Sequence, residues 1–272
     1  MSVRSLQTEA LILRAVDFGE SDRIVHLLTP ETGRVAAIAK GARRSVKRFG
    51  GTLDLFNQLQ VQLAVKPGGA MARLEQSRLL RSFEGLRIRP RAFALGCYLL
   101  ELLDRLAPEG GTQADLARLF AFALRALATL ERREPDARLR TLLELCALDA
   151  LGLRPELRCC VRCTTEVEGP AVGFSIPDGG PVCAACRPGV PDLLPIHLGT
   201  LRALEQGLRL GLERAERLAL GPAALEEARR VLGRFERFHV GVELRSQRFL
   251  EQILQERRTP PAAPSPARSG TH

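Results

Sequence analysis

Two short motifs, Cys160-Val161-Arg162-Cys163 and Cys183-Ala184-Ala185-Cys186, stand nineteen residues apart in the sequence. Each pair can reach one ion from a single turn, and the stretch between them is long enough for a small hairpin that brings the two turns together. Four thiolates at this spacing are typical of a tetrahedral zinc site that is closed to substrate. We therefore expect a structural Zn²⁺ ion on Cys160, Cys163, Cys183 and Cys186, which leaves the function to the regions on either side.

The other cysteines and the overall composition indicate a reduced, soluble protein. The chain has 272 residues, is 45% hydrophobic and contains seven cysteines, an odd number that does not suit a secreted disulfide framework. Cys97 and Cys146 fall in helical patterns and are expected to be small buried residues, whereas Cys159 is expected to be a spare thiol. No apolar run is long enough to cross a bilayer, and no signal-peptide core begins the chain. These features predict a cytoplasmic protein without a membrane partner.

The chain is strongly basic, with a formal net charge of +9. Nearly all of the cations are arginines, which match phosphate geometry and make an anionic polymer the first partner to consider. A GC-rich genome would also favour arginine over lysine. It would not explain the distribution, because residues 1–90 contain fifteen Lys and Arg against eight Asp and Glu and so carry +7 of the +9.

The first part of the chain has the pattern of a small β-barrel. Five segments have strand character and are separated by turn residues: 6–16, 22–29, 34–40, 58–65 and 70–83. Within 58–65 apolar and polar residues alternate with a period of two, and residues 66–69 form a turn. A phase slip at residues 55–57 indicates a bulge. Five strands in residues 1–83 predict a closed barrel of the OB-fold type, a common nucleic-acid-binding fold.

The period changes to that of helices at Pro90, which can open a first helix. Thr112 is expected to cap a second helix and Asp136 a third, with further helices over 198–212 and from Pro222. The fold class is therefore α+β and multidomain. The expected division is an OB-fold barrel over 1–83, helices over 84–157, the zinc segment over 158–188, further helices over 189–256 and a disordered tail over 257–272.

Positive charge is concentrated between the third and fourth predicted strands, where residues 40–48 contain five cations in nine residues. Such a segment gains counterion-release free energy on a phosphate backbone, although a solvated loop without a partner is the alternative. Aromatic residues are scarce, and Phe49 either stacks on a base or anchors the loop. Binding is therefore expected to be mainly electrostatic. The predicted DNA-binding residues are Lys40, Arg43, Arg44, Lys47 and Arg48, extended by Arg14, Arg23 and Arg34.

No catalytic constellation is apparent, and we expect no enzymatic activity. The sequence lacks a phosphate-binding loop and a carboxylate cluster for two catalytic metals, and its four histidines are scattered. Asp17, Glu20 and Asp22 lie close together on a turn, where solvated carboxylates are ordinary. Two alternatives stay open: a nucleic-acid enzyme subunit whose active site needs a partner, and an RNA-binding or transcription-associated zinc protein.

The barrel region and the zinc segment over 158–188, called the knuckle below, together resemble the RecO family of bacterial recombination mediators. The matching stretches in the barrel run from Glu9 to Arg14, from Gly19 to Val25, from Thr29 to Arg34 and from Ala39 to Arg44. The two Cys-x-x-Cys pairs, with Phe174 and Gly179-Gly180 between them, are similar to the zinc segment of many members. The resemblance extends from the first strand to about residue 250, and its basic segment and knuckle are together more specific than either alone.

This resemblance implies a non-enzymatic role in DNA repair and recombination. A member of the family would bind single- and double-stranded DNA, anneal complementary strands and associate with the RecR partner. It would help RecA to load onto DNA coated by single-stranded DNA-binding protein, whose acidic C-terminal tail docks on the helical region. The resemblance therefore implies a cytoplasmic protein that associates with the nucleoid.

Overall fold

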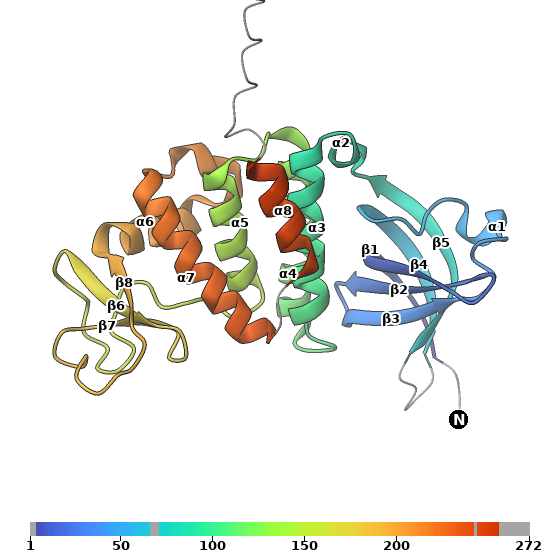
Figure 1. The fold of residues 1–272 in the computed structure, drawn as a ribbon. Coiled ribbons are helices and arrows are strands. Elements are labelled where there is room, and N and C mark those ends of the chain that lie inside the picture. The colour runs from blue at the N-terminus through green and yellow to red at the C-terminus, as the bar shows by residue number, and fades with distance from the viewer. Residues whose placement is uncertain (1–3, 66–70, 242–243, 256–272) are drawn as a thin grey trace, which may run out of the picture.

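The computed structural model describes residues 4–65, 71–241 and 244–255. The predicted turn at 66–69 and the predicted tail at 257–272 lie outside the described residues. A β-barrel lies at one end of the molecule, a helical bundle in the middle, and a small sheet at the other end (Figure 1).

The barrel is built from five strands and is closed, in the order β1-β2-β3-β5-β4. Strands β3 and β5 pair in parallel, and the other neighbours, including β1 and β4, pair antiparallel. This is the predicted five-stranded OB-type barrel. The strands are β1 (Arg4–Phe18), β2 (Asp22–Thr29), β3 (Gly33–Ala39), β4 (Asn57–Val65) and β5 (Ala72–Ser82).

The alternation in β4 fills the barrel core as predicted, because Leu59, Val61 and Leu63 are buried. The intervening glutamines remain partly exposed, as a strand with one wet face requires. The predicted bulge at 55–57 is wrong in position, since the pairing of β4 with β5 shifts within the strand, next to Gln58 and again next to Gln62. The phase slip has another cause: Phe56 has φ of 66°, which turns its side chain away from the barrel core.

Six longer helices of the described residues form the bundle, with a 3-10 segment between the fourth and the fifth of them. Of the two short helices, one lies in the barrel between β3 and β4, and the other follows β5 and leads into the bundle. The predicted starts are confirmed: Thr112 accepts a hydrogen bond from the Asp115 amide, and Asp136 accepts one from the Leu139 amide. No helix in these residues is long and apolar enough to span a membrane. The helices are α1 (Val46–Phe49), α2 (Glu84–Arg87), α3 (Pro90–Leu106), α4 (Gln113–Arg132), α5 (Ala137–Ala150), α6 (Leu198–Leu210), η1 (Leu212–Arg217), α7 (Pro222–Val240) and α8 (Arg245–Gln255).

Helix α8 is a separate element that the sequence pattern did not predict. Helix α7 ends at Gly241, which adopts the left-handed conformation. The first amides of α8 are then satisfied by a distant side chain, because the Glu101 carboxylate on α3 accepts hydrogen bonds from the backbone N–H groups of Arg245 and Ser246 at 3.1 and 2.8 Å. The cap of α8 thus comes from tertiary structure.

The barrel and the bundle share one continuous apolar core. Phe56 packs edge-on against Phe93 of α3 with ring centroids 5.5 Å apart, and Leu11 and Leu28 of the barrel belong to the core of the bundle. Next to the Phe56 ring, α3 carries Gly96, where a Cβ atom would lie 2.8 Å from the ring. This close approach fixes the barrel against the bundle.

Three short strands form the sheet at the far end of the bundle, in the order β7-β6-β8. They are β6 (Ala171–Ser175), β7 (Gly180–Val182) and β8 (Leu194–His197). Strands β6 and β7 are antiparallel neighbours and form the predicted hairpin between the two cysteine pairs. The sheet is inserted between α5 and α6, and α7 packs against β8.

Candidate metal centre and nucleic-acid interface

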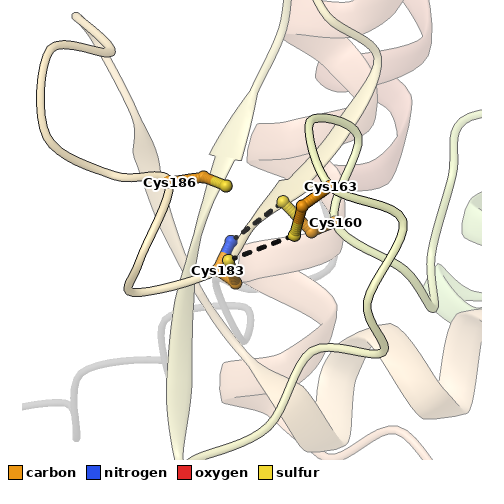
Figure 2. Close-up of side chains that lie close together, drawn as sticks. All are labelled: Cys160, Cys163, Cys183 and Cys186. Atoms are coloured by element: carbon orange, nitrogen blue, oxygen red, sulfur yellow. Dashed lines mark hydrogen bonds between the residues drawn. The ribbon is translucent and has the colours of Figure 1, made fainter.

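The four predicted ligands meet beside the β6–β7 hairpin (Figure 2). Cys160 and Cys163 lie on the loop between α5 and β6, and Cys183 and Cys186 follow β7. Their sulfur atoms all lie within 4.8 Å of one another. The structure therefore brings together the residues that the spacing predicted, in an arrangement that could hold one metal ion.

Tight turns aim the sulfurs of each pair toward the same point. The Thr164 amide donates to the Cys160 carbonyl at 2.9 Å, and the Cys186 amide donates to the Cys183 carbonyl at 3.1 Å. Between the pairs, the Cys183 N–H donates to the Cys160 Sγ at 3.4 Å. An N–H group directed at sulfur favours the thiolate, which is the form that binds metal.

The sulfur spacing fits a four-thiolate site, and the four thiols affect one another's protonation. The Sγ atoms of Cys163 and Cys183 are 3.6 Å apart, close to the separation of about 3.8 Å expected from zinc–sulfur bonds of about 2.3 Å in a tetrahedron. Hydrogen bonds from Thr165, and then from the neighbouring thiols, lower the pKa of Cys163 to about 6. Hydrogen bonding to Cys163 and Cys183 raises the pKa of Cys186 to about 12, so a metal ion would displace the remaining protons.

The thiols outside the group of four have other surroundings. Cys159 is not a member of that group, as predicted, and its amide donates to the Glu156 carboxylate at 3.0 Å. Burial raises the pKa of Cys97 to about 11 and that of Cys146 to about 12. These two thiols therefore stay protonated and pack as small, largely buried residues.

The basic loop, defined as residues 40–48, lies at the end of the barrel far from the bundle (Figure 1). It is tied to the turn between β1 and β2, because the Asp22 carboxylate accepts hydrogen bonds from Lys40 Nζ at 2.7 Å and from the Gly41 amide at 2.8 Å. These two bonds lower the pKa of Asp22. The Arg43 amide also donates to the Ser21 carbonyl at 3.0 Å. The loop is therefore fixed by the strands beneath it.

The outward-facing cations of the loop are only loosely paired. Arg43 lies 3.8 Å from Asp17, and Arg44 lies 3.9 Å from Glu20. The side chains of Arg44 and Glu20 are 75% and 94% exposed, so water screens their attraction. Lys47 is exposed and makes no hydrogen bond or ion pair with a residue that the structure describes. Arg43, Arg44 and Lys47 can therefore give up their weak ion pairs and bound water to bind phosphate.

Arg48 and Phe49 hold the loop in place. Arg48 donates to the Lys40 carbonyl at 2.8 Å and to the Ser45 hydroxyl at 3.1 Å, and its guanidinium lies over the Phe49 ring. Phe49 is only 2% exposed and belongs to the barrel core. The prediction that Phe49 stacks on a base is therefore wrong, and the alternative, an anchor for the loop, is confirmed.

The three outlying arginines do not lie together. Arg23 is paired with Ala39 in the sheet, next to the loop, and binds Asp17 at 2.7 Å. Arg14 pairs with His26 in the middle of β2 and lines a hollow against α3 together with Asp104. Arg34 lies at the far end of β3, 3.5 Å from the same Asp104. Six residue steps along the strand, roughly 20 Å, separate Arg34 from Lys40 at the start of the loop. The structure groups Arg23 with the loop and places Arg14 and Arg34 beside the bundle.

Sequence reasoning missed the carboxylates that order this region. Asp17 and Asp22 are not merely solvated turn residues, because Asp17 lies 2.7 Å from Arg23 and Asp22 lies 2.7 Å from Lys40. Glu20 is 94% exposed, so the expectation of a solvated carboxylate is confirmed for it. The register of the β2–β3 hairpin would have located these carboxylates. Because Arg23 pairs with Ala39, the adjacent residues Asp22 and Lys40 must lie close together. Beside them the surface is hollowed over about 330 Å³, lined in part by Arg23, Arg43, Gly51 and Asp54.

Comparison with known proteins agrees with this architecture. The family described as "Recombination protein O N terminal" matches residues 1–83, and the one described as "Recombination protein O C terminal" matches residues 89–248. The DNA repair protein RecO of Anaeromyxobacter sp. (strain K) is 42% identical over 244 residues, which cover 89% of this chain and 94% of the relative. The DNA repair protein RecO of Roseiflexus sp. (strain RS-1) is 35% identical over 261 residues, 95% of this chain and 89% of the relative. Together with the barrel, the bundle and the four-cysteine group, these matches show that the chain belongs to the RecO family.

Proposed function

We propose that this chain is a non-enzymatic mediator of DNA repair and homologous recombination that acts in the cytoplasm, at the nucleoid. It binds single- and double-stranded DNA, anneals complementary strands and, with RecR, helps RecA to load onto DNA coated by single-stranded DNA-binding protein. The observation that carries the proposal is the fixed basic loop on an OB-type barrel. Membership of a family whose relatives are named DNA repair proteins supports the same role.

The exposed cations of the basic loop are better placed to bind DNA phosphates than to pair with the carboxylates of the barrel. Asp22 is engaged by the loop backbone as well as by Lys40, so it orders the loop and leaves Arg43, Arg44 and Lys47 exposed. A DNA backbone offers these cations many anionic partners and releases condensed counterions. Cations that screen two strands at once reduce the repulsion between them, which would speed annealing without any covalent step.

The four-cysteine group would bind Zn²⁺ as a structural ion. All four protein ligands are thiolates in a closed arrangement, which favours zinc and leaves no position for substrate. The ion would join two turns that are otherwise linked by the short hairpin and by a few hydrogen bonds, such as that from the Val161 amide to the Pro181 carbonyl at 3.0 Å, so its binding free energy would add to the stability of this segment.

The acidic tail of single-stranded DNA-binding protein would dock in an arginine cleft of the bundle, defined by Arg91, Arg140 and Arg229 and also lined by Asp136, Glu226 and Glu251. Arg140 is paired with Glu144 and Arg229 with Glu226, so Arg91 is the cation of the cleft that would meet the tail. The cleft measures about 700 Å³ and lies at the N-terminal ends of α3, α5 and α7, whose dipoles favour negative charge. Arg91 makes no hydrogen bond or ion pair with another described residue. An Arg91→Ala variant should therefore bind an acidic peptide with a C-terminal phenylalanine several-fold more weakly, while binding DNA normally.

Strand annealing tests the function directly. The purified chain should accelerate annealing of two complementary oligonucleotides at low salt without a nucleotide cofactor, as followed by fluorescence energy transfer. The triple variant Arg43→Ala, Arg44→Ala, Lys47→Ala should lose most of this acceleration. A control that removes three exposed arginines of the bundle, Arg118, Arg132 and Arg209, should retain it. No acceleration by the intact chain, or a preference for structured RNA over DNA at equal salt, would contradict the proposal.

A further inference from the structure

We propose that the molecule carries a second binding site for single-stranded nucleic acid, in a groove between the zinc knuckle and α7. This knuckle groove is lined by Ile176 after β6, Leu193 before β8, and Arg234, Arg237 and Phe238 on α7, and it measures about 680 Å³. It is open to solvent along its length, as a surface that binds an extended strand requires. It lies outside the basic loop and the arginine cleft.

The groove presents two uncommitted cations. Arg234 and Arg237 are exposed, and neither side chain makes a hydrogen bond or an ion pair with a described residue. Several other arginines of the bundle are committed instead, as Arg229 shows by pairing with Glu226 at 2.7 Å. One carboxylate, that of Asp192, contributes to the lining. The two guanidinium groups are therefore available to an anionic ligand.

An aromatic ring stands beside these cations. Phe238 is 54% exposed, and its ring packs edge-on against His239 with centroids 5.4 Å apart. The contact supports one side of the ring and leaves the rest accessible. An exposed ring next to arginines is the arrangement that holds single strands, because a base stacks on the ring while the guanidinium groups bind phosphate.

The groove is preorganised by contacts outside it. Arg230, one turn before Arg234, donates to the Pro195 carbonyl of β8 at 2.7 Å, which holds α7 against the knuckle sheet. Gly179, in the hairpin turn, packs near the Phe235 ring, since a Cβ there would lie 3.7 Å from it. The knuckle thus forms one wall of the groove. The metal centre would therefore help to shape a binding surface.

A nucleic-acid strand fits this groove better than an acidic peptide does. A peptide would satisfy the two arginines, but it could stack on the Phe238 ring only where it carries an aromatic side chain, whereas every base of a nucleic-acid strand has a face that can stack there. Arg234 and Arg237 also lie about 4.5 Å apart along the helix axis, so they can contact successive groups of one extended chain. The basic loop lies at the opposite end of the molecule (Figure 1). One protein molecule would therefore hold two nucleic-acid strands at once.

Salt-dependent binding of a fluorescent 30-nucleotide oligothymidine to the full, zinc-loaded chain tests the groove. Arg234→Ala/Arg237→Ala should weaken binding and reduce the slope of log K against log salt by about 1.4, since each phosphate contact on a single strand contributes about 0.7. Phe238→Ala should weaken binding roughly tenfold with little change of slope, and Phe238→Tyr should restore it. Arg118→Ala/Arg209→Ala removes the same charge elsewhere and should change neither quantity appreciably.

A second readout detects the two strands together. Two non-complementary oligonucleotides with donor and acceptor dyes should show energy transfer on the wild-type chain, and the Arg234→Ala/Arg237→Ala variant should lose it while still binding one strand. Groove variants that match the charge control, or that lose affinity only for an acidic peptide, would overturn the inference and leave the basic loop as the DNA site. If the basic-loop variant also bound normally, the proposed function itself would fail.

Discussion

Tyr98 on α3 donates its hydroxyl to the carboxylate of Glu236 on α7, and both side chains are buried inside the helical bundle. The second oxygen of Glu236 has no hydrogen-bond partner among the described residues. Burial, and then the nearby Glu144 carboxylate, raise the pKa of Glu236 to about 8. Glu236 is therefore protonated in the folded protein at neutral pH, because a buried, incompletely bonded carboxylate is costly.

This buried acid predicts that the bundle loses stability as the pH rises. The folded-state pKa of Glu236 lies above its ordinary value of 4.5, so its contribution is fully present below about pH 4.5 and is lost as the pH rises through about 8. In the wild-type chain the free energy of unfolding should fall by about 1 kcal/mol per pH unit over this range, and in Glu236→Gln this fall should be absent. Urea unfolding from pH 5 to 9 measures it. Glu226→Gln, an exposed change on the same helix, should keep the wild-type slope, and a Glu236→Gln variant that also kept it would disprove the assignment.

The basic loop should account for a defined part of the salt dependence of DNA binding. Replacing Arg43, Arg44 and Lys47 with alanine should reduce the slope for single-stranded DNA by about 2, since up to three phosphate contacts are lost. Arg48 is excluded because it fixes the loop through the Lys40 carbonyl. Fluorescence anisotropy titrations at several salt concentrations measure the slope, with the Arg118, Arg132 and Arg209 triple variant as the charge control. An unchanged slope would remove the loop from the interface.

The metal centre offers a matched pair of cysteine substitutions. Cys160→Ser removes a buried ligand and should abolish stoichiometric metal binding and lower the melting temperature, because three thiolates hold the ion less tightly and the knuckle loses its link. Cys159→Ser changes the adjacent thiol, which lies outside the group of four, and should keep both properties. Metal analysis and thermal unfolding of both variants decide the matter: full zinc content in Cys160→Ser would refute the ligand assignment.

The junction between barrel and bundle depends on the glycine beneath Phe56. In Gly96→Ala the new methyl group would lie 2.8 Å from the Phe56 ring, an overpacking that should cost about 1–3 kcal/mol and be offset by up to about 1 kcal/mol from the helix propensity of alanine. Gly233→Ala makes the same change in α7, where nothing lies within 4 Å of the added Cβ, and should stabilise the chain by up to about 1 kcal/mol. Equilibrium unfolding should therefore show Gly96→Ala to be less stable than Gly233→Ala by about 1–3 kcal/mol, and equal effects would contradict the close packing at Gly96.

Features that depend on only a few neighbouring residues could be predicted from the sequence. The alternation around Leu59, the Cys-x-x-Cys pairs and the helix starts at Pro90 and Thr112 each depend on local spacing or capping, and the structure confirms each of them. The density of cations in residues 40–48 likewise needed only the order of residues along the chain. These features gave the barrel, the knuckle and the position of the basic loop.

Contacts between distant residues were decided only in the tertiary structure. Glu101 caps α8 from another helix, Phe49 turns into the barrel core, and Arg34 pairs with Asp104 of α3 rather than joining the loop. The groove at Phe238 likewise exists because α7 meets a hairpin formed more than fifty residues earlier in the chain. Sequence periodicity indicates which residues avoid water, whereas the partner of each side chain depends on how the elements pack against one another.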